Sequence, residues 1–281
     1  MSRVGHDPVR FSIRVRQRIQ APPTRYTSLA DLPHKGGGKN QPGIYLPPLW
    51  GRSEKPQVST GGGAKCQNAL AHPASYDWWS RQMTKTDVRI VSGELRGRKV
   101  PCRVHPGLRP TPQMVREALF SILGDAVPDR PFYDVFAGTG VVGLEAISRG
   151  ASVAKLIERE PGQVADIQKC AIQFGIGKQV QVLRADAYRW AAQWVPSAEP
   201  VNLFLSPPFP DLEGPKCEAF LVLVQQLFDR MTPCSVLAVQ VELGFPHETL
   251  ADAAEWDVRT YGRNQLLVRV KLAPEPLPSA E

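Results

Sequence analysis

The stretch that most constrains the fold is FYDVFAGTGVVG, residues 132–143. Its first residues are aromatic and β-branched, which suits a strand buried on both faces of a sheet. Gly138 and Gly140 follow, and glycine permits a positive φ and a close approach of backbone to a ligand. From Val141 onwards apolar residues recur at helical spacing, so the free N–H groups of a helix face the turn. The stretch predicts a strand, a glycine turn and a helix.

A glycine turn alone also occurs in ordinary strand-to-helix loops, and two later features favour a binding site. A predicted strand ends at Glu158, roughly 20 residues after the glycines, where nucleoside sites place the acid that accepts ribose hydroxyls. A further apolar strand ends in SPPF, residues 206–209. A dehydrogenase is disfavoured because the third glycine of the dinucleotide-binding pattern is missing.

Strand and helix patterns alternate from residue 131 onwards, which predicts an α/β fold with a Rossmann-like, doubly wound parallel sheet. Ligands of such sheets bind at the carboxyl ends of the strands. Asp134, Glu158, Asp186 and Ser206 all fall at or near predicted strand ends, so we expect them to share one cleft. After the first strand and helix, strands are expected at 153–157, 180–183, 201–205, 235–241, around 258 and at 266–270. Helices are expected at 161–174, through 190 and 194, at 217–229 and, more weakly, near 247–254.

The chain is divided unevenly by charge. Residues 1–86 carry a net charge of +9, residues 87–130 carry +3, and residues 131–281 carry −5. The first segment is rich in proline and glycine and has no lasting apolar periodicity, so it is expected to be a disordered basic extension. It is either a tail that contacts RNA, an Arg-rich transit segment, or a segment that is not translated. Asp7, Asp31 and the lack of an amphipathic helix count against a transit segment.

Residues 87–130 are expected to form a β-hairpin and a helix. The hairpin pattern covers residues 88–102, and Arg96, Arg98 and Lys99 lie along it, either against phosphates or on a solvated face. Thr111 is the expected N-cap of the helix that follows, with Pro112 in its first position. Arg109 and Arg116 flank this helix start and either serve a site or pair with acids. The remaining parts are the α/β domain at 131–273, which carries the expected cleft, and a tail at 274–281.

Composition excludes several other classes of protein. The five cysteines have no short paired spacing, so neither a metal site nor a disulfide framework is expected, and a reducing cytoplasm fits. No apolar run approaches the ~18 residues of a membrane span. No apolar segment of the secretory type follows the N-terminus, so neither a membrane nor a secretory route is expected.

Taken together, the motifs resemble those of a known family. The segments DVFAGTG (134–140), LIE (156–158), RAD (184–186) and SPPF (206–209) are similar to those of S-adenosylmethionine-dependent amino-methyltransferases. The upstream segments RIVSGELRGRKV (89–100), LRPT (108–111) and VREALF (115–120) resemble the bacterial small-subunit rRNA guanine-N2 methyltransferases of the RsmD type. The resemblance covers residues 88–272. It implies a seven-stranded sheet whose last strand is antiparallel, and a hairpin that helps to hold RNA.

The resemblance also implies roles for residues at the cleft. Ser206, Pro207, Pro208 and Phe209 would form the catalytic turn, in which the carbonyl of Pro207 accepts an amine N–H and Phe209 stacks on the base. Glu158 would accept the ribose hydroxyls of S-adenosylmethionine and Asp186 its adenine amine. The remaining donor-binding residues would be Asp134, Phe136, Ala137, Gly138, Thr139, Gly140, Arg109 and Thr111. The RNA-binding residues would be Arg96, Arg98, Lys99 and Arg116, and the substrate would be 16S rRNA or the small ribosomal subunit, bound by a monomer.

Ser206 departs from the family pattern, which has Asp or Asn at this position. A serine hydroxyl can accept a hydrogen bond, but it is shorter and uncharged. We therefore expect weaker transfer, a shifted substrate or no transfer. The alternatives are an adenine or other amino-methylase acting on nucleic acid, and a donor-binding RNA-binding protein with little or no activity.

Because the family resemblance begins soon after Met83, we predict that Met83 is the native start. Intact-mass analysis of the protein from its natural source should give a chain that lacks residues 1–82. A peptide from these residues in native extract would contradict the prediction.

Overall fold

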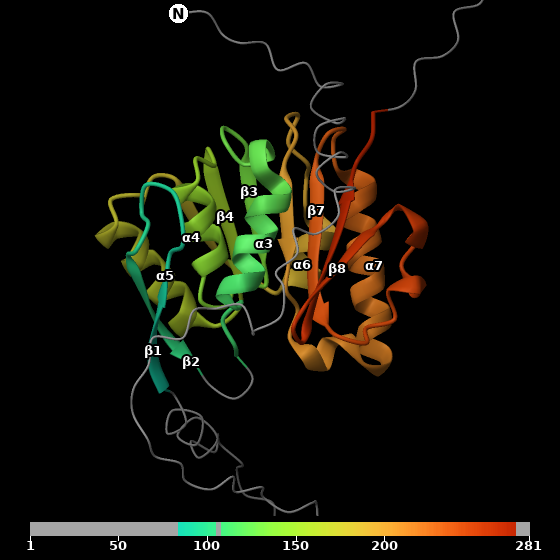
Figure 1. The fold of residues 1–281 in the computed structure, drawn as a ribbon, viewed down its shortest axis with the longest axis horizontal. Helices are drawn as coiled ribbons and strands as arrows, with labels where there is room; N and C mark the ends of the chain where they lie inside the picture. The colour runs from blue at the N-terminus through green and yellow to red at the C-terminus, as the bar shows by residue number, and fades with distance from the viewer. Residues whose placement is uncertain (1–83, 105–107, 274–281) are drawn as a thin grey trace, which may run out of the picture. The chain divides into compact units, whose positions relative to one another are not determined.

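The computed structural model describes residues 84–104 and 108–273 (Figure 1). The predictions for residues 1–83, Met83 included, and for the tail lie outside these ranges. The strands are β1 Thr84–Arg89, β2 Lys99–Val104, β3 Pro131–Val135, β4 Val153–Glu158, β5 Val180–Arg184, β6 Asn202–Leu205, β7 Val236–Glu242, β8 Asp257–Tyr261 and β9 Asn264–Val270. The α-helices are α3 Gln113–Leu123, α4 Val141–Ser148, α5 Pro161–Gln173, α6 Ala187–Gln193 and α7 Gly214–Arg230. Short 3-10 helices are η1 Gly124–Ala126, η2 Phe209–Leu212, η3 His247–Thr249 and η4 Ala253–Glu255.

The main sheet has seven strands in the order β5-β4-β3-β6-β7-β9-β8. The first five are mutually parallel, and β9 runs antiparallel to both β7 and β8. The chain continues from β3 to β4 on one side and returns to β6 on the other, so the strand order reverses between β3 and β6. Ligands of open α/β sheets bind at such a reversal. The predicted seven-stranded, doubly wound fold with an antiparallel last strand is confirmed.

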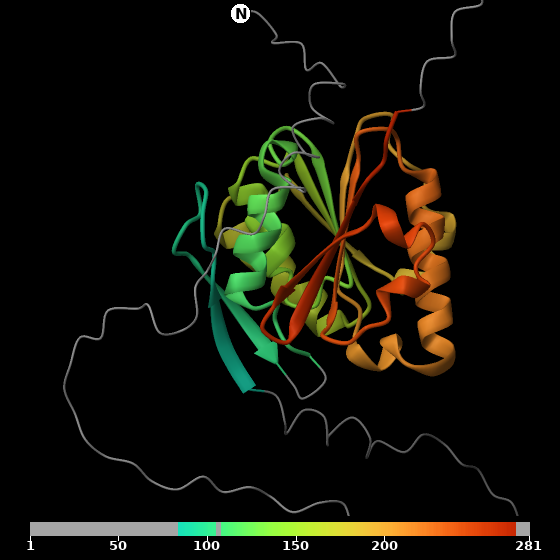
Figure 2. The same cartoon turned by 45° about the vertical axis from the view of Figure 1, so that its right-hand side comes forward.

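Helices cover both faces of this sheet (Figure 2). One apolar core joins α3, α4 and α5 to side chains such as Phe132, Leu156 and Phe204. The other joins α6 and α7 to side chains such as Val135 and Leu205. Successive strand residues point to opposite faces, so one short apolar strand supplies both cores.

Two local predictions were wrong. The segment near 247–254 forms η3 and η4 rather than one helix, since its short stretches bury only isolated side chains such as Leu250. Thr111 is not the N-cap of α3, because that position is held by Pro112 and no side chain caps the helix. Thr111 is instead buried, and its carbonyl accepts a hydrogen bond from Arg116.

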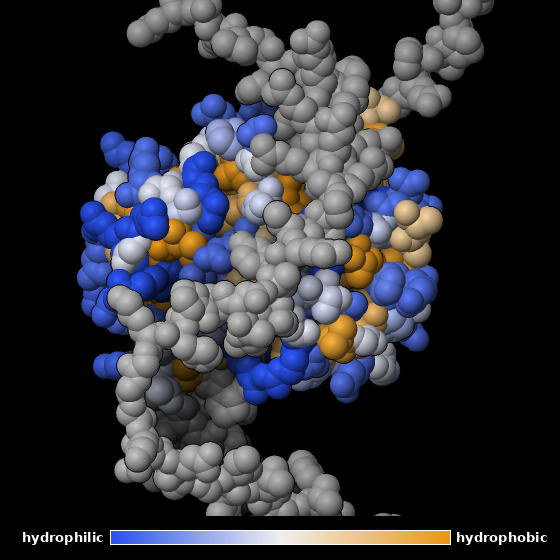
Figure 3. Space-filling view, in the orientation of Figure 1, coloured by the Kyte–Doolittle hydropathy of each residue, from blue (hydrophilic) through white to orange (hydrophobic). Residues whose placement is uncertain are grey.

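The predicted hairpin is formed by β1 and β2, which pair in antiparallel register from Thr84 with Val104 to Arg89 with Lys99. Because β1 begins at Thr84, the expected boundary after residue 86 falls inside a strand. The hairpin shares the apolar core of α3, α4 and α5, so it is packed onto the main sheet's helices. Hydrophilic residues predominate on the side of the surface where the hairpin and α5 lie (Figure 3).

Arg116 does not face RNA, and the prediction that it does is wrong. Its side chain is 1% exposed. Its Nε donates to Glu145 at 3.0 Å, and its terminal nitrogens donate to the carbonyls of Thr111 at 2.6 Å and Arg89 at 2.7 Å. Arg149 donates to the other oxygen of Glu145 at 2.7 Å. The guanidinium therefore ties the hairpin and α3 to α4 from inside the protein.

Replacing Arg116 should destabilise the protein, because one oxygen of the buried Glu145 and the carbonyls of Thr111 and Arg89 lose their donor, while Arg149 still pairs with the other oxygen. We expect Arg116→Met to lower the free energy of unfolding by about 3–5 kcal/mol in urea titrations. The control is Arg96→Met, which removes an exposed arginine and should change it by less than about 0.5 kcal/mol. Equal effects of the two substitutions would contradict the structural role of Arg116.

Candidate active site

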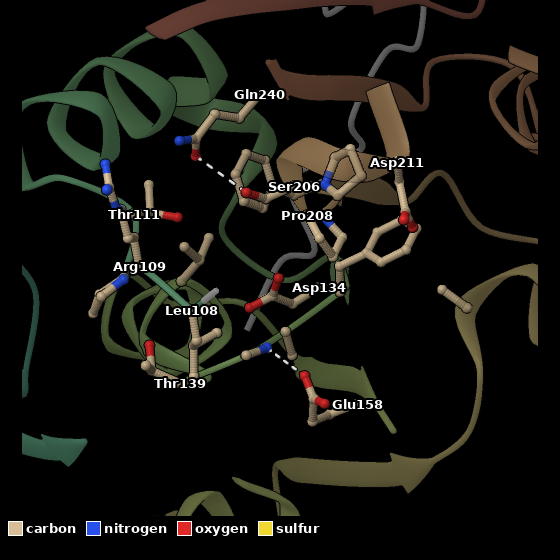
Figure 4. Close-up of a pocket in the computed structure, with 18 of the residues that line it drawn as sticks. Leu108, Arg109, Thr111, Asp134, Thr139, Glu158, Ser206, Pro208, Asp211 and Gln240 are labelled. Carbon is tan, nitrogen blue, oxygen red and sulfur yellow. Dashed lines mark hydrogen bonds between the residues drawn. The ribbon is translucent and has the colours of Figure 1, made fainter. Parts of the chain in front are cut away.

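A cleft of about 470 Å³ opens at the carboxyl ends of the parallel strands (Figure 4). Its lining includes Asp134 near the end of β3, Glu158 at the end of β4, Asp186 after β5 and Ser206 after β6. These residues lie far apart in the sequence, and the parallel strands bring them together. The prediction that they share one cleft is confirmed.

The glycine turn has the backbone that its residues predict. Gly138 and Gly140 have φ values of 53° and 71°. A Cβ on Gly140 would lie 2.7 Å from Ile167 and 3.0 Å from Leu156, so a larger residue does not fit there. Phe136 also has a positive φ, of 71°, which is unusual for a bulky side chain and is found at binding sites. Helix α4 begins directly after the turn, as predicted.

Asp134 is 1% exposed, and its carboxylate accepts a hydrogen bond of 3.0 Å from the backbone N–H of Gly143 in α4. Burial raises the pKa of Asp134 to about 8, and this N–H only partly opposes the shift. The carboxyl group is therefore largely protonated at pH 7 in the free protein. A cation bound beside it would favour the charged form.

Glu158 holds the glycine turn against β4. One carboxylate oxygen accepts from the N–H of Gly138 at 2.7 Å, and the other from the N–H of Glu160 at 2.8 Å. Burial raises the pKa of Glu158, while these two backbone donors oppose the shift. Each oxygen keeps further acceptor capacity, so the predicted role towards ribose hydroxyls fits the geometry and stays a prediction.

Asp186 acts as the N-cap of α6, because its carboxylate accepts from the N–H of Arg189 at 3.1 Å. It also lines the cleft, so capping and ligand binding do not exclude each other. The segment that precedes α3 closes another side of the cleft, where Arg109 is exposed and Thr111 is buried. Leu108 lies over the turn, since a Cβ on Gly138 would come within 2.9 Å of its side chain.

The catalytic turn predicted at 206–209 leaves β6 and enters the 3-10 helix η2. Ser206, Pro207, Pro208 and Phe209 all line the cleft. The Oγ of Ser206 lies 3.5 Å from Oε1 of Gln240, and Nε2 of Gln240 donates to Asn264 at 3.0 Å. In the close-up, Ser206 and Pro208 lie on one side of Asp134 and Glu158 lies on the other (Figure 4).

Sequence reasoning missed several residues of the lining. Gln240 and Asn264 belong to β7 and β9, which were read only as strands. Tyr188 donates to Asp211 at 2.9 Å on the same wall as the catalytic turn. Leu205 pairs with Val239, so Gln240, the next residue of β7, lies beside Ser206. Only the strand pairing indicates this neighbour, and the sequence alone does not.

Strand order, glycine turn and acids at successive strand ends define a Rossmann-like fold of the methyltransferase class. Residues 88–269 match the family model described as Conserved hypothetical protein 95, and the chain belongs to this family. "Ribosomal RNA small subunit methyltransferase D" of Escherichia coli (strain K12) is 40% identical over 123 residues, which are 43% of this chain and 60% of that protein. The chain thus spans less than two thirds of this relative's length.

Two further comparisons also find proteins that are named as methyltransferases. "Putative rRNA methyltransferase YlbH" of Bacillus subtilis (strain 168) is 29% identical over 141 residues, which are 50% of this chain and 74% of that protein. The solved structure of "Putative methyltransferase yhhF from Escherichia coli" has a TM-score of 0.55 and 30% sequence identity, and the match covers 67% of this chain and 100% of that one.

The raised pKa of Asp134 predicts a pH dependence of stability. An Asp whose folded pKa is about 8 holds a proton in the folded state up to that pH, whereas the unfolded chain releases it near pH 4. The free energy of unfolding therefore falls between about pH 4 and 8. Asp134→Asn should remove this fall, so its stability relative to the parent should rise from pH 5 to pH 8 in urea titrations. A difference that does not change with pH would contradict the burial of an uncompensated carboxyl group.

Proposed function

We propose that the protein transfers the methyl group of S-adenosylmethionine to the exocyclic N2 of a guanine in small-subunit ribosomal RNA. The observation that carries this is one cleft that combines the buried Asp134 and the half-buried Glu158, both next to a glycine turn, with a Ser-Pro-Pro-Phe turn. The names of its relatives support methyl transfer to ribosomal RNA, and the name of the Escherichia coli relative specifies the small subunit. The protein would act in the cytoplasm as a monomer. The part of the chain that the structure describes holds no helix long and apolar enough to cross a bilayer.

The residues present fit a cationic donor. S-adenosylmethionine carries a sulfonium and an ammonium group, and a cation stabilises the ionised form of a buried acid such as Asp134. The residues that would hold the donor are Asp134, Glu158, Asp186 and the turn at 136–140, with Arg109 and Thr111 closing the side. The bound donor supplies the methyl group, whose carbon bonds to the amine nitrogen while the carbon–sulfur electron pair stays on sulfur.

The chain's own contribution is to orient the amine. The carbonyl of Pro207 and the hydroxyl of Ser206 would accept its two N–H groups, and Phe209 would stack on the base. Holding the amine in line with the methyl group removes the entropic cost of bringing the two reactants together. The proton lost from N2 would leave to water, because a serine hydroxyl cannot take it at neutral pH.

RNA would be held by the hairpin. Arg96, Arg98 and Lys99 are exposed, and Arg98 lies over the ring of Phe174 at 5.4 Å. The ion pair of Lys99 with Asp87, at 3.4 Å, is itself exposed and therefore weak, so it leaves the lysine available to phosphate. We propose that residues 87–130 contribute this RNA-facing surface and residues 131–273 the catalytic domain.

A second candidate function is that of a donor-binding RNA-binding protein with little activity. Ser206 is the observation that favours it, because it replaces the charged or amide acceptor of the family. The two functions differ in whether labelled methyl groups reach the RNA.

The test is tritiated methyl transfer to small ribosomal subunits from a strain that lacks this modification. We expect transfer by the parent protein, mapped to the N2 of one guanine. Ser206→Asp should be about ten- to a hundredfold faster, because a carboxylate makes a charge-assisted bond to the amine. Absence of transfer by both proteins, with donor binding intact, would favour the second function. A variant no faster than an active parent would contradict the role given to Ser206.

A further inference from the structure

A lone serine hydroxyl is a poor acceptor for an amine, because it rotates freely and can present its own hydrogen instead of a lone pair. At 206, the side chain must accept an N–H from the base to orient the nitrogen lone pair. Something must therefore direct the hydroxyl hydrogen away from the substrate. The structure offers one neighbour that does so.

Gln240 stands beside Ser206 because β6 and β7 are parallel and Leu205 is the register partner of Val239. The next residue on each strand then points to the same face of the sheet. Gln240 is 6% exposed, and its Oε1 faces the Ser206 Oγ at 3.5 Å (Figure 4). This separation is long for an O–H···O bond, and catalytic hydrogen bonds are often long until the substrate binds.

The amide of Gln240 is itself oriented. Its Nε2 donates to Oδ1 of Asn264 at 3.0 Å, at the start of β9. With the nitrogen engaged there, the oxygen is the atom that faces Ser206. An amide oxygen has no hydrogen to offer, so any hydrogen bond between the two must be donated by the serine.

We propose that Gln240 is a positioning residue that fixes Ser206 as a donor towards β7 and so presents the serine lone pairs to the substrate amine. The inference rests on the proposed function and deepens it. The order of hydrogen bonds is amine to Ser206, Ser206 to Gln240, and Gln240 to Asn264. In a chain of this kind each bond polarises the next, which makes the serine oxygen a better acceptor. Gln240 thus offsets part of the acceptor strength that is lost when serine replaces Asp or Asn at this position.

The test is a double-mutant cycle in single-turnover methyl transfer at saturating small subunits. Gln240→Leu removes the acceptor and should slow transfer about tenfold, as expected for one oriented hydrogen bond. Gln240→Glu keeps an acceptor oxygen at the same reach but loses the amide hydrogens that Asn264 accepts, so it should slow transfer less than Gln240→Leu does. In the Ser206→Ala background, Gln240→Leu should change the rate by less than twofold, because Gln240 acts only through the serine.

The matched control is Gln265→Leu. Gln265 is a buried glutamine on β9, 9% exposed, that lies outside the cleft lining, so the same chemical change there should leave the rate within twofold. Donor affinity, measured by calorimetry with S-adenosylhomocysteine, should be unchanged within twofold in Gln240→Leu. A purely structural effect would instead weaken donor binding or slow the control as well.

A readout that is independent of activity is the side-chain amide resonance of Gln240, which is assigned by its loss in Gln240→Leu. Ser206→Ala should shift it. An unshifted resonance, or an equal slowing by Gln240→Leu in the parent and in Ser206→Ala, would overturn the inference. A parent that transfers no methyl group contradicts the proposed function, whereas an active parent that Gln240→Leu leaves unchanged contradicts only this inference.

Discussion

The site depends on a carboxyl group buried at the end of β3. Asp134 is almost fully enclosed, and the hydrogen bond from Gly143 ties it to the first turn of α4. That helix can come so close only because glycine is present: a Cβ on Gly143 would lie 2.8 Å from the side chain of Leu156 on β4. The tight packing of turn, helix and sheet thus creates the burial that raises the pKa of Asp134. A site in this condition favours a ligand that brings positive charge.

The wall of the cleft that is formed by the 206–209 turn, β7 and β9 is polar but uncharged where Ser206, Gln240 and Asn264 meet. Ser206, Gln240 and Asn264 form an uncharged chain of hydrogen bonds, and the prolines at 207 and 208 fix the backbone between them and Phe209. A charged acceptor would orient an amine more strongly. In the proposed reaction the uncharged chain would instead orient the amine through geometry, and this chain of contacts requires β7 and β9 as well as β6. The antiparallel strand at the end of the chain is therefore part of the proposed active site.

Local patterns predicted what depends on a few neighbouring residues. The glycine turn at 138–140, α5 with its leading proline and the acids at strand ends could all be read from the sequence. Long-range contacts could not. The sequence left open whether Arg116 serves a site or pairs with an acid, and only packing shows that Glu145, Thr111 and Arg89 surround it. Gln240 carried no signal, because its role arises from strand register.

The central claim is that the carboxyl groups at the strand ends together bind one cationic donor. Calorimetric titration with S-adenosylmethionine at pH 7, in two buffers of different ionisation enthalpy, tests it most directly. We predict one binding site and the release of a fraction of a proton as Asp134 ionises beside the cation. Absence of binding, or binding whose heat is the same in both buffers, would contradict the account.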